Sequence, residues 1–471
     1  MSTSDAIVVG SGPNGLAAAI TLARAGVSVQ VLEAEATIGG AARSLELTLP
    51  GFVHDVGSAI HPLAYDSPFF RTLPLGDHGL QWVHSPAPLA HPLDGGDAVT
   101  LEVDVGETAA QLGEDAGRYT RIFTGAANTW ADLLKSLSTA TLARHAPTVA
   151  SLSLACAGSA TGFVRWNFRT ARARALIAGM AAHSTLPLSK FTTGGIAIAL
   201  ATAGHVGGWP FARGGAQKLS NALASYLRSQ GGTITTGVRV RDLRELPPAR
   251  AVLLDITPRQ FLQIAGDQLP HPYTKFLKHF RYGMGAYKLD WALSEPVPWT
   301  SPALGRAATI HVGGTMEEIS AHELSAWNGK PGARPFAIVA QHSLFDPTRS
   351  PDGKHTLWAY CHVPNGAEID MTSAVEAQIE RFAPGFRDTI LARSVLPPRR
   401  LESLNANLIG GDILGGKQDL YQMLIRPTMR YWTTPLDGVY LCSASTPPGG
   451  GVHGMCGHIA ANIALRQKFR A

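Results

Sequence analysis

The sequence predicts an α/β protein in which a discontinuous Rossmann-like dinucleotide-binding domain is combined with an inserted α+β domain. Strand–turn–helix segments rich in glycine occur at the N-terminus, in the middle and at the C-terminus of the chain. Long stretches of different character separate these three segments. With 471 residues the chain is too long for one hydrophobic core and suits two interleaved domains.

The N-terminal segment carries a complete dinucleotide-binding fingerprint. The apolar run at 6–9 predicts a buried parallel strand, a helix is predicted over 16–25, and a second strand over 27–32 ends at Glu33. The turn between the first strand and the helix has G-x-G-x-x-G spacing, from Gly10, Gly12 and Gly15. The glycines allow a tight turn against a pyrophosphate, and the acid suits a ribose hydroxyl.

A second glycine pair follows the fingerprint and distinguishes an FAD site from an NAD site. Gly39 and Gly40 come shortly after Glu33, and Arg43 stands just beyond them. In isolation the pair would fit an ordinary turn and a cofactor contact equally well. Next to the fingerprint, it lets a further backbone segment contact a cofactor longer than NAD, and the arginine can reach a phosphate or the flavin edge. We therefore predict FAD.

The C-terminal segment 438–465 contains a second glycine-rich loop that could contact the same ligand as the N-terminal fingerprint. It has the pattern of a buried strand, a Pro/Gly loop and an apolar helix. Five glycines lie where the loop enters the helix: Gly449, Gly450, Gly451, Gly454 and Gly457. Backbone N–H groups at such a helix start can approach something flat or anionic.

The middle segment resembles βαβ material between two insertions. Gly214 and Gly215 precede a helix with leucines on one face, a strand is predicted over 233–240, and another begins at 251. We expect 67–207 to be largely helical and 273–427 to be strand-rich, with the clearest strands over 283–293 and 336–345. The predicted FAD-binding domain comprises 1–66, 208–272 and 428–471; the predicted substrate domain comprises 67–207 and 273–427.

Composition narrows the class of protein. Charged residues make up 16% of the chain and apolar residues 45%, which indicates a large interior, an apolar tunnel or a sticky surface. The 40 basic and 35 acidic residues form no polybasic tract, so we expect no nucleic-acid partner, although a net charge of +5 allows peripheral contact with anionic membranes. Four cysteines without a C-x-x-C predict neither a disulfide framework nor a dithiol site.

Nothing in the sequence predicts a membrane span or a signal peptide. The stretch 194–208 is the most apolar, but it is short and punctuated by glycine, which favours a buried helix or a tunnel wall. We therefore expect a cytoplasmic protein that can touch a membrane surface. No residue pattern predicts a metal site.

Five motifs resemble a known family. GSGPNGLAAA, HDVGSAIHP, GGAQKLSNAL, QHSLFDPTRSPDGKHTLW and YLCSASTPPGGGVHGMCG together resemble the phytoene dehydrogenase-like flavoproteins of the flavin amine oxidase superfamily. They are most similar to the branch of pyridine nucleotide-disulphide oxidoreductase domain-containing proteins, over 7–464. The resemblance implies a p-hydroxybenzoate-hydroxylase-like FAD domain, a substrate domain, and oxidation or reduction of lipophilic molecules. The name of this branch suggests a redox-active disulfide, but the sequence shows no cysteine pair of that kind.

The same resemblance implies the cofactor contacts. Ser58 and Ala59 would approach the isoalloxazine, Val238 would bind adenine through its main chain, and 451–454 would lie under the flavin pyrimidine edge. The full implied set is Gly10, Gly12, Pro13, Asn14, Gly15, Glu33, Ala34, Gly39, Gly40, Ala41, Arg43, Ser58, Ala59, Val238, Ser443, Gly451, Val452, His453 and Gly454.

Two residues are candidates for catalysis. Lys288 resembles the lysine near flavin N5 in flavin amine oxidases, and strand alternation places it on one face with Ala286 and Asp290. It can position water or deliver a proton, or simply pair with Asp290. His453 stands in the flavin loop, where it can contact flavin or substrate, cap the helix, or pack.

These features favour an FAD-dependent oxidoreductase that transfers hydride between flavin N5 and a C–C bond of a lipophilic substrate such as an isoprenoid or polyene. A flavin amine oxidase and a flavin-dependent isomerase are alternatives, although Gly451 replaces an aromatic expected in an amine oxidase. A flavin-free prenyl-protein chaperone is disfavoured because the pyrophosphate glycines are intact. We expect oxygen or a quinone as electron acceptor, and a homodimer is left open.

Overall fold

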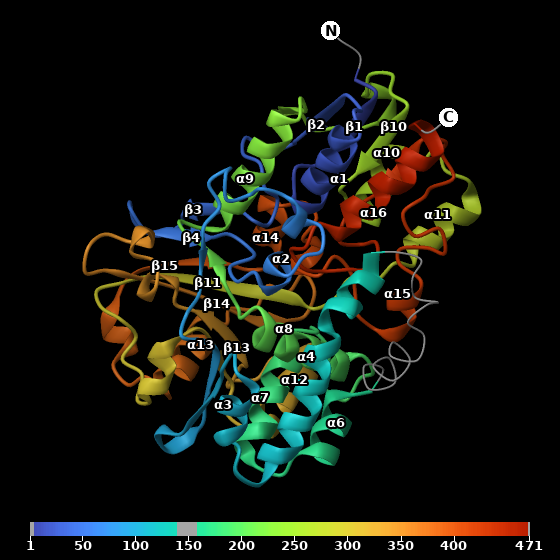
Figure 1. Ribbon diagram of the computed structural model, residues 1–471. Helices are drawn as coiled ribbons and strands as arrows, with labels where there is room; N and C mark the ends of the chain where they lie inside the picture. Colours follow the sequence, from blue (N-terminus) through green and yellow to red (C-terminus); the bar gives the residue numbers. More distant parts are fainter. Residues whose placement is uncertain (1–3, 139–157, 470–471) are drawn as a thin grey trace.

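The computed structural model describes residues 4–138 and 158–469 and contains two main sheets (Figure 1). The first has five strands, all parallel, in the order β16-β10-β1-β2-β9. Its strands come from three distant stretches of the chain: β1 (Ala6–Val9), β2 (Val29–Leu32), β9 (Thr233–Thr235), β10 (Ala251–Leu254) and β16 (Val439–Leu441). The predicted Rossmann-like parallel sheet is confirmed.

Helices cover both faces of this sheet because its central strand is apolar on both sides. In β1, Ala6 and Val8 join the core formed with α1 (Pro13–Arg24), α9 (Ala216–Ser229) and α16 (Met455–Ala464). Ile7 and Val9 face the opposite core, formed with α10 (Pro258–Ala265) and α11 (His271–Lys278). Figure 1 shows α1 and α16 side by side at the top of the molecule.

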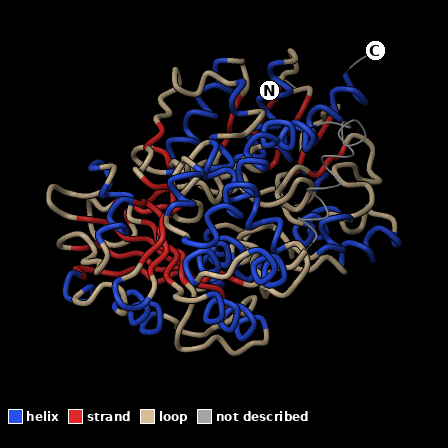
Figure 2. Tube along the Cα trace, turned by 60° about the horizontal axis from the view of Figure 1, so that its bottom comes forward, coloured by secondary structure: helices blue, strands red, loops and turns tan. Residues whose placement is uncertain are grey.

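The second sheet has seven strands in the order β15-β11-β14-β13-β12-β6-β7. Neighbouring strands are antiparallel except for the parallel pair β6 and β12. Figure 2 shows these strands crowded together at the lower left, away from the shorter strands of the first sheet. Their bounds are β6 (Ala87–Pro92), β7 (Ala98–Leu101), β11 (Gly285–Leu293), β12 (Ala307–Val312), β13 (Ala337–Ala340), β14 (His355–Val363) and β15 (Ile390–Leu396).

Strands β6 and β7 lie in a stretch that we expected to be largely helical. Every residue of β6 is buried, so its apolar run lacks the alternation that distinguishes a strand from a buried helix. The run forms a strand because it pairs with β12, which is more than 200 residues away in the sequence. The rest of the stretch, where the structure describes it, is mainly helical: α3 (Val105–Ala110), α4 (Ala116–Ser138), α6 (Ala160–Asn167), α7 (Ala171–Ala182) and α8 (Thr193–Val206). The short helix α2 (Pro62–Tyr65) comes just before it.

The apolar stretch 194–208 is the buried helix α8, as predicted. No helix within the described residues is long and apolar enough to cross a bilayer. The remaining elements are short hairpin strands and peripheral helices: β3 (Ser44–Glu46), β4 (Val53–Asp55), β5 (Trp82–Val83), β8 (Phe211–Ala212), α12 (Met316–Trp327), α13 (Thr372–Glu380), α14 (Pro398–Leu404) and α15 (Leu420–Leu424). Cys361, Cys442 and Cys456 are buried free thiols, and Cys156 lies outside the described residues.

Candidate functional site

A cavity of about 780 Å³ extends from the glycine turn after β1 to one face of the second sheet. The first sheet supplies the ends of β1, β2 and β10, where parallel strands with helical crossovers usually bind ligands. Most of the predicted set lines this cavity: Gly10, Gly12, Pro13, Asn14, Glu33, Ala34, Gly40, Ala41, Arg43, Ser58, Ala59, Val238, Ser443, Gly451, Val452 and Lys288.

The two glycine turns meet at this end of the cavity. A Cβ on Gly40 would lie 3.2 Å from the Cα of Gly12, so the two backbones are nearly in contact. Gly15 and Gly39 stand behind the cavity wall and have a packing role. A Cβ on Gly15 would lie 2.1 Å from the carbonyl oxygen of Gly10, and one on Gly39 would lie 2.7 Å from that of Ala42.

Glu33 is held in place at the end of β2. Its Oε2 accepts hydrogen bonds from the main-chain N–H of Ser11 (2.8 Å) and from the Ser11 hydroxyl (2.5 Å). Its Oε1 accepts from the Glu35 N–H at 2.9 Å. The carboxylate is therefore oriented before any ligand arrives, and its remaining lone pairs can accept from ribose hydroxyls.

Arg43 supplies the positive charge of the site. The guanidinium is buried and donates to the carbonyls of Gly40 and Leu404 and to the Thr37 hydroxyl. Among the described residues no carboxylate pairs with it. A buried, uncompensated cation beside two glycine turns fits an anionic pyrophosphate. The buried Oδ1 of Asn14, which has no partner within the described structure, is a further polar atom available to a ligand.

Asp255 was not singled out by the sequence analysis, yet it sits inside the fingerprint turn. It directly follows β10, is buried, and accepts a hydrogen bond from the Gly15 N–H at 2.9 Å. Burial raises the pKa of its carboxyl to about 7, against the opposing effect of that N–H. In the sequence, only its position directly after an apolar strand could have pointed to Asp255.

The main chain of Val238, predicted to bind adenine, is partly engaged within the protein. The N–H of Val238 already donates to the Glu33 carbonyl at 2.8 Å, because the chain bends away from the sheet after β9. The predicted strand over 233–240 is therefore shorter than expected. Val240 also lines the cavity, and no hydrogen bond is found for its N–H among the described residues. The carbonyl oxygen of Val238, which accepts no main-chain hydrogen bond among the described residues, and the N–H of Val240 are both open to a main-chain contact.

The C-terminal loop divides into a cavity-facing part and a packing part. Gly451 and Val452 line the cavity, whereas His453 and Gly454 do not. The Nδ1 of His453 accepts a hydrogen bond from the Met455 N–H at 3.0 Å, so this histidine caps α16 and does not face a ligand. A Cβ on Gly457 would lie 1.8 Å from the carbonyl oxygen of Asn14, so this glycine serves the contact between α16 and α1.

Lys288 both lines the cavity and pairs with Asp290, on the strand face that alternation predicted. The pair is buried, and the Oδ1 of Asp290 lies 3.5 Å from the Nδ1 of His54. Burial lowers the pKa of the Lys288 ammonium and raises the pKa of the Asp290 carboxyl to about 6. Lys288 therefore releases a proton into the cavity more readily than an exposed lysine would.

The far end of the cavity is mainly apolar. Trp358 and Tyr360 of β14 form an edge-to-face pair with ring centroids 5.2 Å apart, and the Lys288 Nζ lies 5.8 Å from the Trp358 ring. The alternation in WAYCHV places both rings on one face of the strand. Other apolar residues of this wall are Ile60, Leu63, Ile196, Ala199, Leu200, Trp209, Ala286, Ile338, Leu404, Leu408, Ile413 and Leu414.

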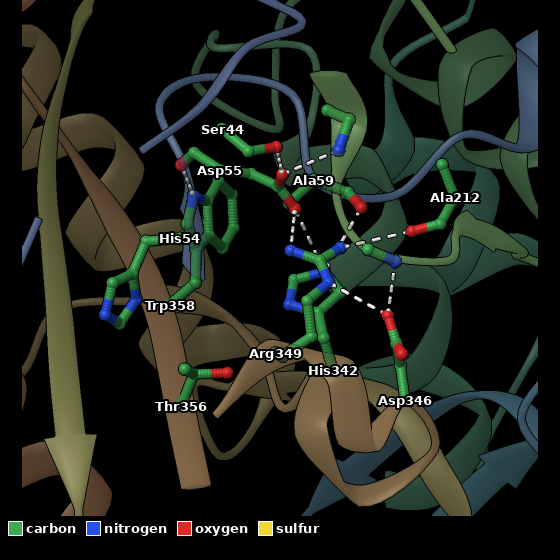
Figure 3. Close-up of polar contacts among 12 residues, drawn as sticks. Ser44, His54, Asp55, Ala59, Ala212, His342, Asp346, Arg349, Thr356 and Trp358 are labelled. Carbon is green, nitrogen blue, oxygen red and sulfur yellow. Dashed lines mark hydrogen bonds and ion pairs between the residues drawn. The ribbon is translucent and has the colours of Figure 1, made fainter. Parts of the chain in front are cut away.

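A buried ion network holds the segment that carries Ser58 and Ala59 (Figure 3). Arg349 pairs with Asp55 at 3.0 Å and with Asp346 at 3.1 Å. The His342 ring lies 3.1 Å from the Ala59 carbonyl oxygen. The network joins the HDVGSAIHP and QHSLFDPTRSPDGKHTLW motifs, which are nearly 300 residues apart. Its role is to position the cavity wall.

His61, in the same segment, is one of the histidines near glycine or proline turns that could line an apolar tunnel, and it does line the cavity. Neither ring nitrogen of this buried histidine has a hydrogen-bond partner within the described structure. Burial lowers the pKa of its imidazole to about 4, so the ring is neutral at pH 7. It can offer a bound molecule one donor and one acceptor.

Comparison with known proteins agrees with this geometry. A sequence profile of the NAD(P)-binding Rossmann-like domain matches residues 8–73. Pyridine nucleotide-disulfide oxidoreductase domain-containing protein 2 of Rattus norvegicus is 27% identical over 98% of this chain and 93% of its own length. Phytoene desaturase (neurosporene-forming) of Rhodobacter capsulatus is 26% identical over 52% of this chain and 51% of its own. The chain is homologous to both proteins.

Among solved structures, putrescine oxidase bound to putrescine superimposes with a TM-score of 0.62 at 19% identity, over 98% of either chain. At this identity the likeness shows a shared fold only. The resemblance stated from the motifs is thus confirmed as homology to a pyridine nucleotide-disulfide oxidoreductase domain-containing protein and a phytoene desaturase, and as a fold shared with putrescine oxidase.

Proposed function

We propose that this protein is an FAD-dependent oxidoreductase that acts on a C–C bond of a lipophilic substrate. When bound, FAD would supply hydride transfer at its N5 atom. Glu33 would hold the ribose, Arg43 and the Gly12 and Gly40 turns the pyrophosphate, and Gly451 and Val452 the flavin end. The observation that carries the proposal is one cavity that joins a dinucleotide-binding turn to an apolar wall.

The protein's own contribution is to exclude water and to place a neutral, extended substrate against the wall of α8 and β14. Lys288 faces this wall with its pKa lowered by burial, so it can hold or release a proton beside the reacting carbon. Oxygen or a quinone is our choice of electron acceptor, because only one Rossmann-like sheet is found in the described residues.

An amine oxidase is the second candidate, and one observation favours it. The edge-to-face pair of Trp358 and Tyr360 offers ring faces that attract a substrate cation. The Lys288 ammonium close to the Trp358 ring opposes it, since it repels a second cation in the same space. We therefore place the C–C oxidoreductase first.

The test has two stages. Purified protein should show flavin absorbance, as isolated or after addition of FAD, and Arg43→Met should weaken FAD binding at least about tenfold. Arg121→Met, at an exposed position on α4, is the matched control and should bind normally. Anaerobic flavin reduction is then followed with polyenes and with amines. Absence of flavin binding would refute the cofactor, and reduction by amines alone would favour the second candidate.

A further inference from the structure

An exposed apolar surface covers α15 and the loop that follows it. Leu424 is 63% exposed and Met429 is 74% exposed. Phe191 borders the same hollow of about 740 Å³ as Leu420 and Tyr421. We call the exposed set the α15 patch; its members are Phe191, Leu420, Tyr421, Met423, Leu424, Met429 and Tyr431. Apolar surface concentrated in this way marks an interaction site.

Helix α15 buries a polar side chain and exposes apolar ones, the opposite of an ordinary surface helix. Its buried anchor is the polar Gln422, whose Nε2 donates to the carbonyls of Arg281 (2.7 Å) and Lys417 (3.2 Å). Asp419 caps the helix by accepting from the Gln422 N–H at 3.0 Å. These polar contacts hold the helix with its apolar side chains facing outward. The apolar side chains of α15 are therefore exposed because its hydrogen bonds are made on the opposite side of the helix.

Basic residues surround the patch. Asp419 is the only acid among the described residues that line the hollow, and Arg281 neutralises it at 2.9 Å. Lys190, Lys275 and Arg281 are exposed and line the hollow, and the exposed Arg430 stands between Met429 and Tyr431 in the chain. The exposed Lys278 follows Lys275 by one turn of α11. Figure 1 shows α11, which carries Lys275 and Lys278, on the same side of the molecule as α15. Apolar side chains within a basic rim match an anionic bilayer surface, whereas a basic rim would repel itself in a symmetric dimer.

The patch is continuous with the cavity wall. Met423 belongs to the patch and also lines the cavity, together with Leu414 and Gln418. We propose that the α15 patch docks the protein on anionic lipid bilayers and that lipophilic substrate passes from the bilayer by Met423 into the cavity. The second half of this statement rests on the proposed function; the docking does not.

Flotation of the full-length protein with vesicles tests the docking. Vesicles of phosphatidylcholine containing phosphatidylglycerol should carry the protein, and vesicles of phosphatidylcholine alone should carry much less. The double variant L424S/M429S should lower the bound fraction at least about tenfold. K275E/K278E should lower it about as much, and only on the anionic vesicles. Leu391→Ser, at an exposed apolar position on β15, is the matched control and should float normally.

Three outcomes would overturn the proposal: no flotation on anionic vesicles, an equal loss in the Leu391→Ser control, or a dimer that L424S/M429S converts to monomer without an effect on flotation. The last result would make the patch a contact between two copies of the chain. Bound flavin is measured in parallel. Flotation without flavin would refute the proposed function alone, and flavin without flotation would refute the docking alone.

Discussion

The carboxylate of Asp255 accepts a hydrogen bond from the Gly15 N–H at 2.9 Å, within the turn that binds a pyrophosphate in Rossmann-like domains. A Cβ on Gly12 would lie 2.8 Å from the same carboxylate oxygen. A buried carboxylate and a pyrophosphate would thus occupy neighbouring positions. Their repulsion is smallest when Asp255 is protonated.

FAD affinity should therefore depend on the protonation of Asp255. Because burial raises the pKa of this carboxyl to about 7, it ionises as the pH rises through that value. We expect the affinity for FAD to fall by up to about tenfold for each pH unit above 7. Asp255→Asn keeps an acceptor for the Gly15 N–H and should bind FAD with no such pH dependence. Flavin fluorescence titration of the apoprotein between pH 6 and 9 measures this.

Stability gives an independent check on Asp255. A carboxyl whose pKa is raised on folding stabilises the protein at low pH, and this contribution is lost as the pH rises through the raised value. Asp255→Asn should therefore raise the free energy of unfolding at pH 8 by about 1–3 kcal/mol. A variant that is less stable than wild type at pH 8 would contradict the assignment.

The second prediction concerns the role of Lys288 in proton transfer. Lys288→Met alone would leave the Asp290 carboxylate buried and unpaired, at a cost of about 3–5 kcal/mol of stability. The double variant K288M/D290N removes both charges and should fold with normal flavin content. We expect it to slow substrate-driven flavin reduction by about a hundredfold and to change its pH profile, as loss of a general acid or base does. An unchanged rate would remove Lys288 from the mechanism.

The third prediction concerns the ion network around Arg349. Arg349→Met leaves Asp55 and Asp346 buried without their cation, and should lower the free energy of unfolding in urea by about 3–5 kcal/mol. Arg169→Met removes a solvent-exposed pair with Glu114 and should change stability little. Equal effects of the two variants would contradict the structural role of the network.

The pH dependence of this network follows from Asp55. Burial would raise the pKa of its carboxyl, but Arg349 and His342 outweigh burial and lower it to about 2. The ionised carboxylate thus stabilises the fold above its ordinary pKa, and this contribution is lost as the pH falls toward 2. Asp55→Asn should flatten the stability profile between about pH 4 and pH 2 in acid titrations.

Gly457 provides the fourth test, because it lets α16 approach α1. A Cβ here would meet the Asn14 carbonyl oxygen at 1.8 Å, so Gly457→Ala should cost about 1–3 kcal/mol of stability in urea unfolding. Gly125→Ala on α4 is the control, since a Cβ there meets nothing within 4 Å. It should be neutral or stabilising by up to about 1 kcal/mol. The reverse order would refute the close-packing role.

The cofactor turn was predictable because its chemistry is local. Gly10, Gly12 and Gly15 act through spacing along one turn, and Glu33 follows the next strand directly. Strand alternation was equally local and placed Lys288 on the cavity face. Neighbours along the chain define the geometry of these residues, so local patterns were enough to predict it.

The other contacts of the site join residues that are far apart in the sequence. Asp255 meets Gly15 across 240 positions of the chain, and Arg349 meets Asp55 across 294. His453 and Gly457 belong to a glycine-rich segment whose pattern is typical of a cofactor-binding loop, yet His453 caps α16 and Gly457, within α16, packs on α1. Whether a glycine or a buried polar side chain faces a ligand or another helix depends on what lies opposite. That neighbour comes from distant sequence, through packing that no local pattern encodes.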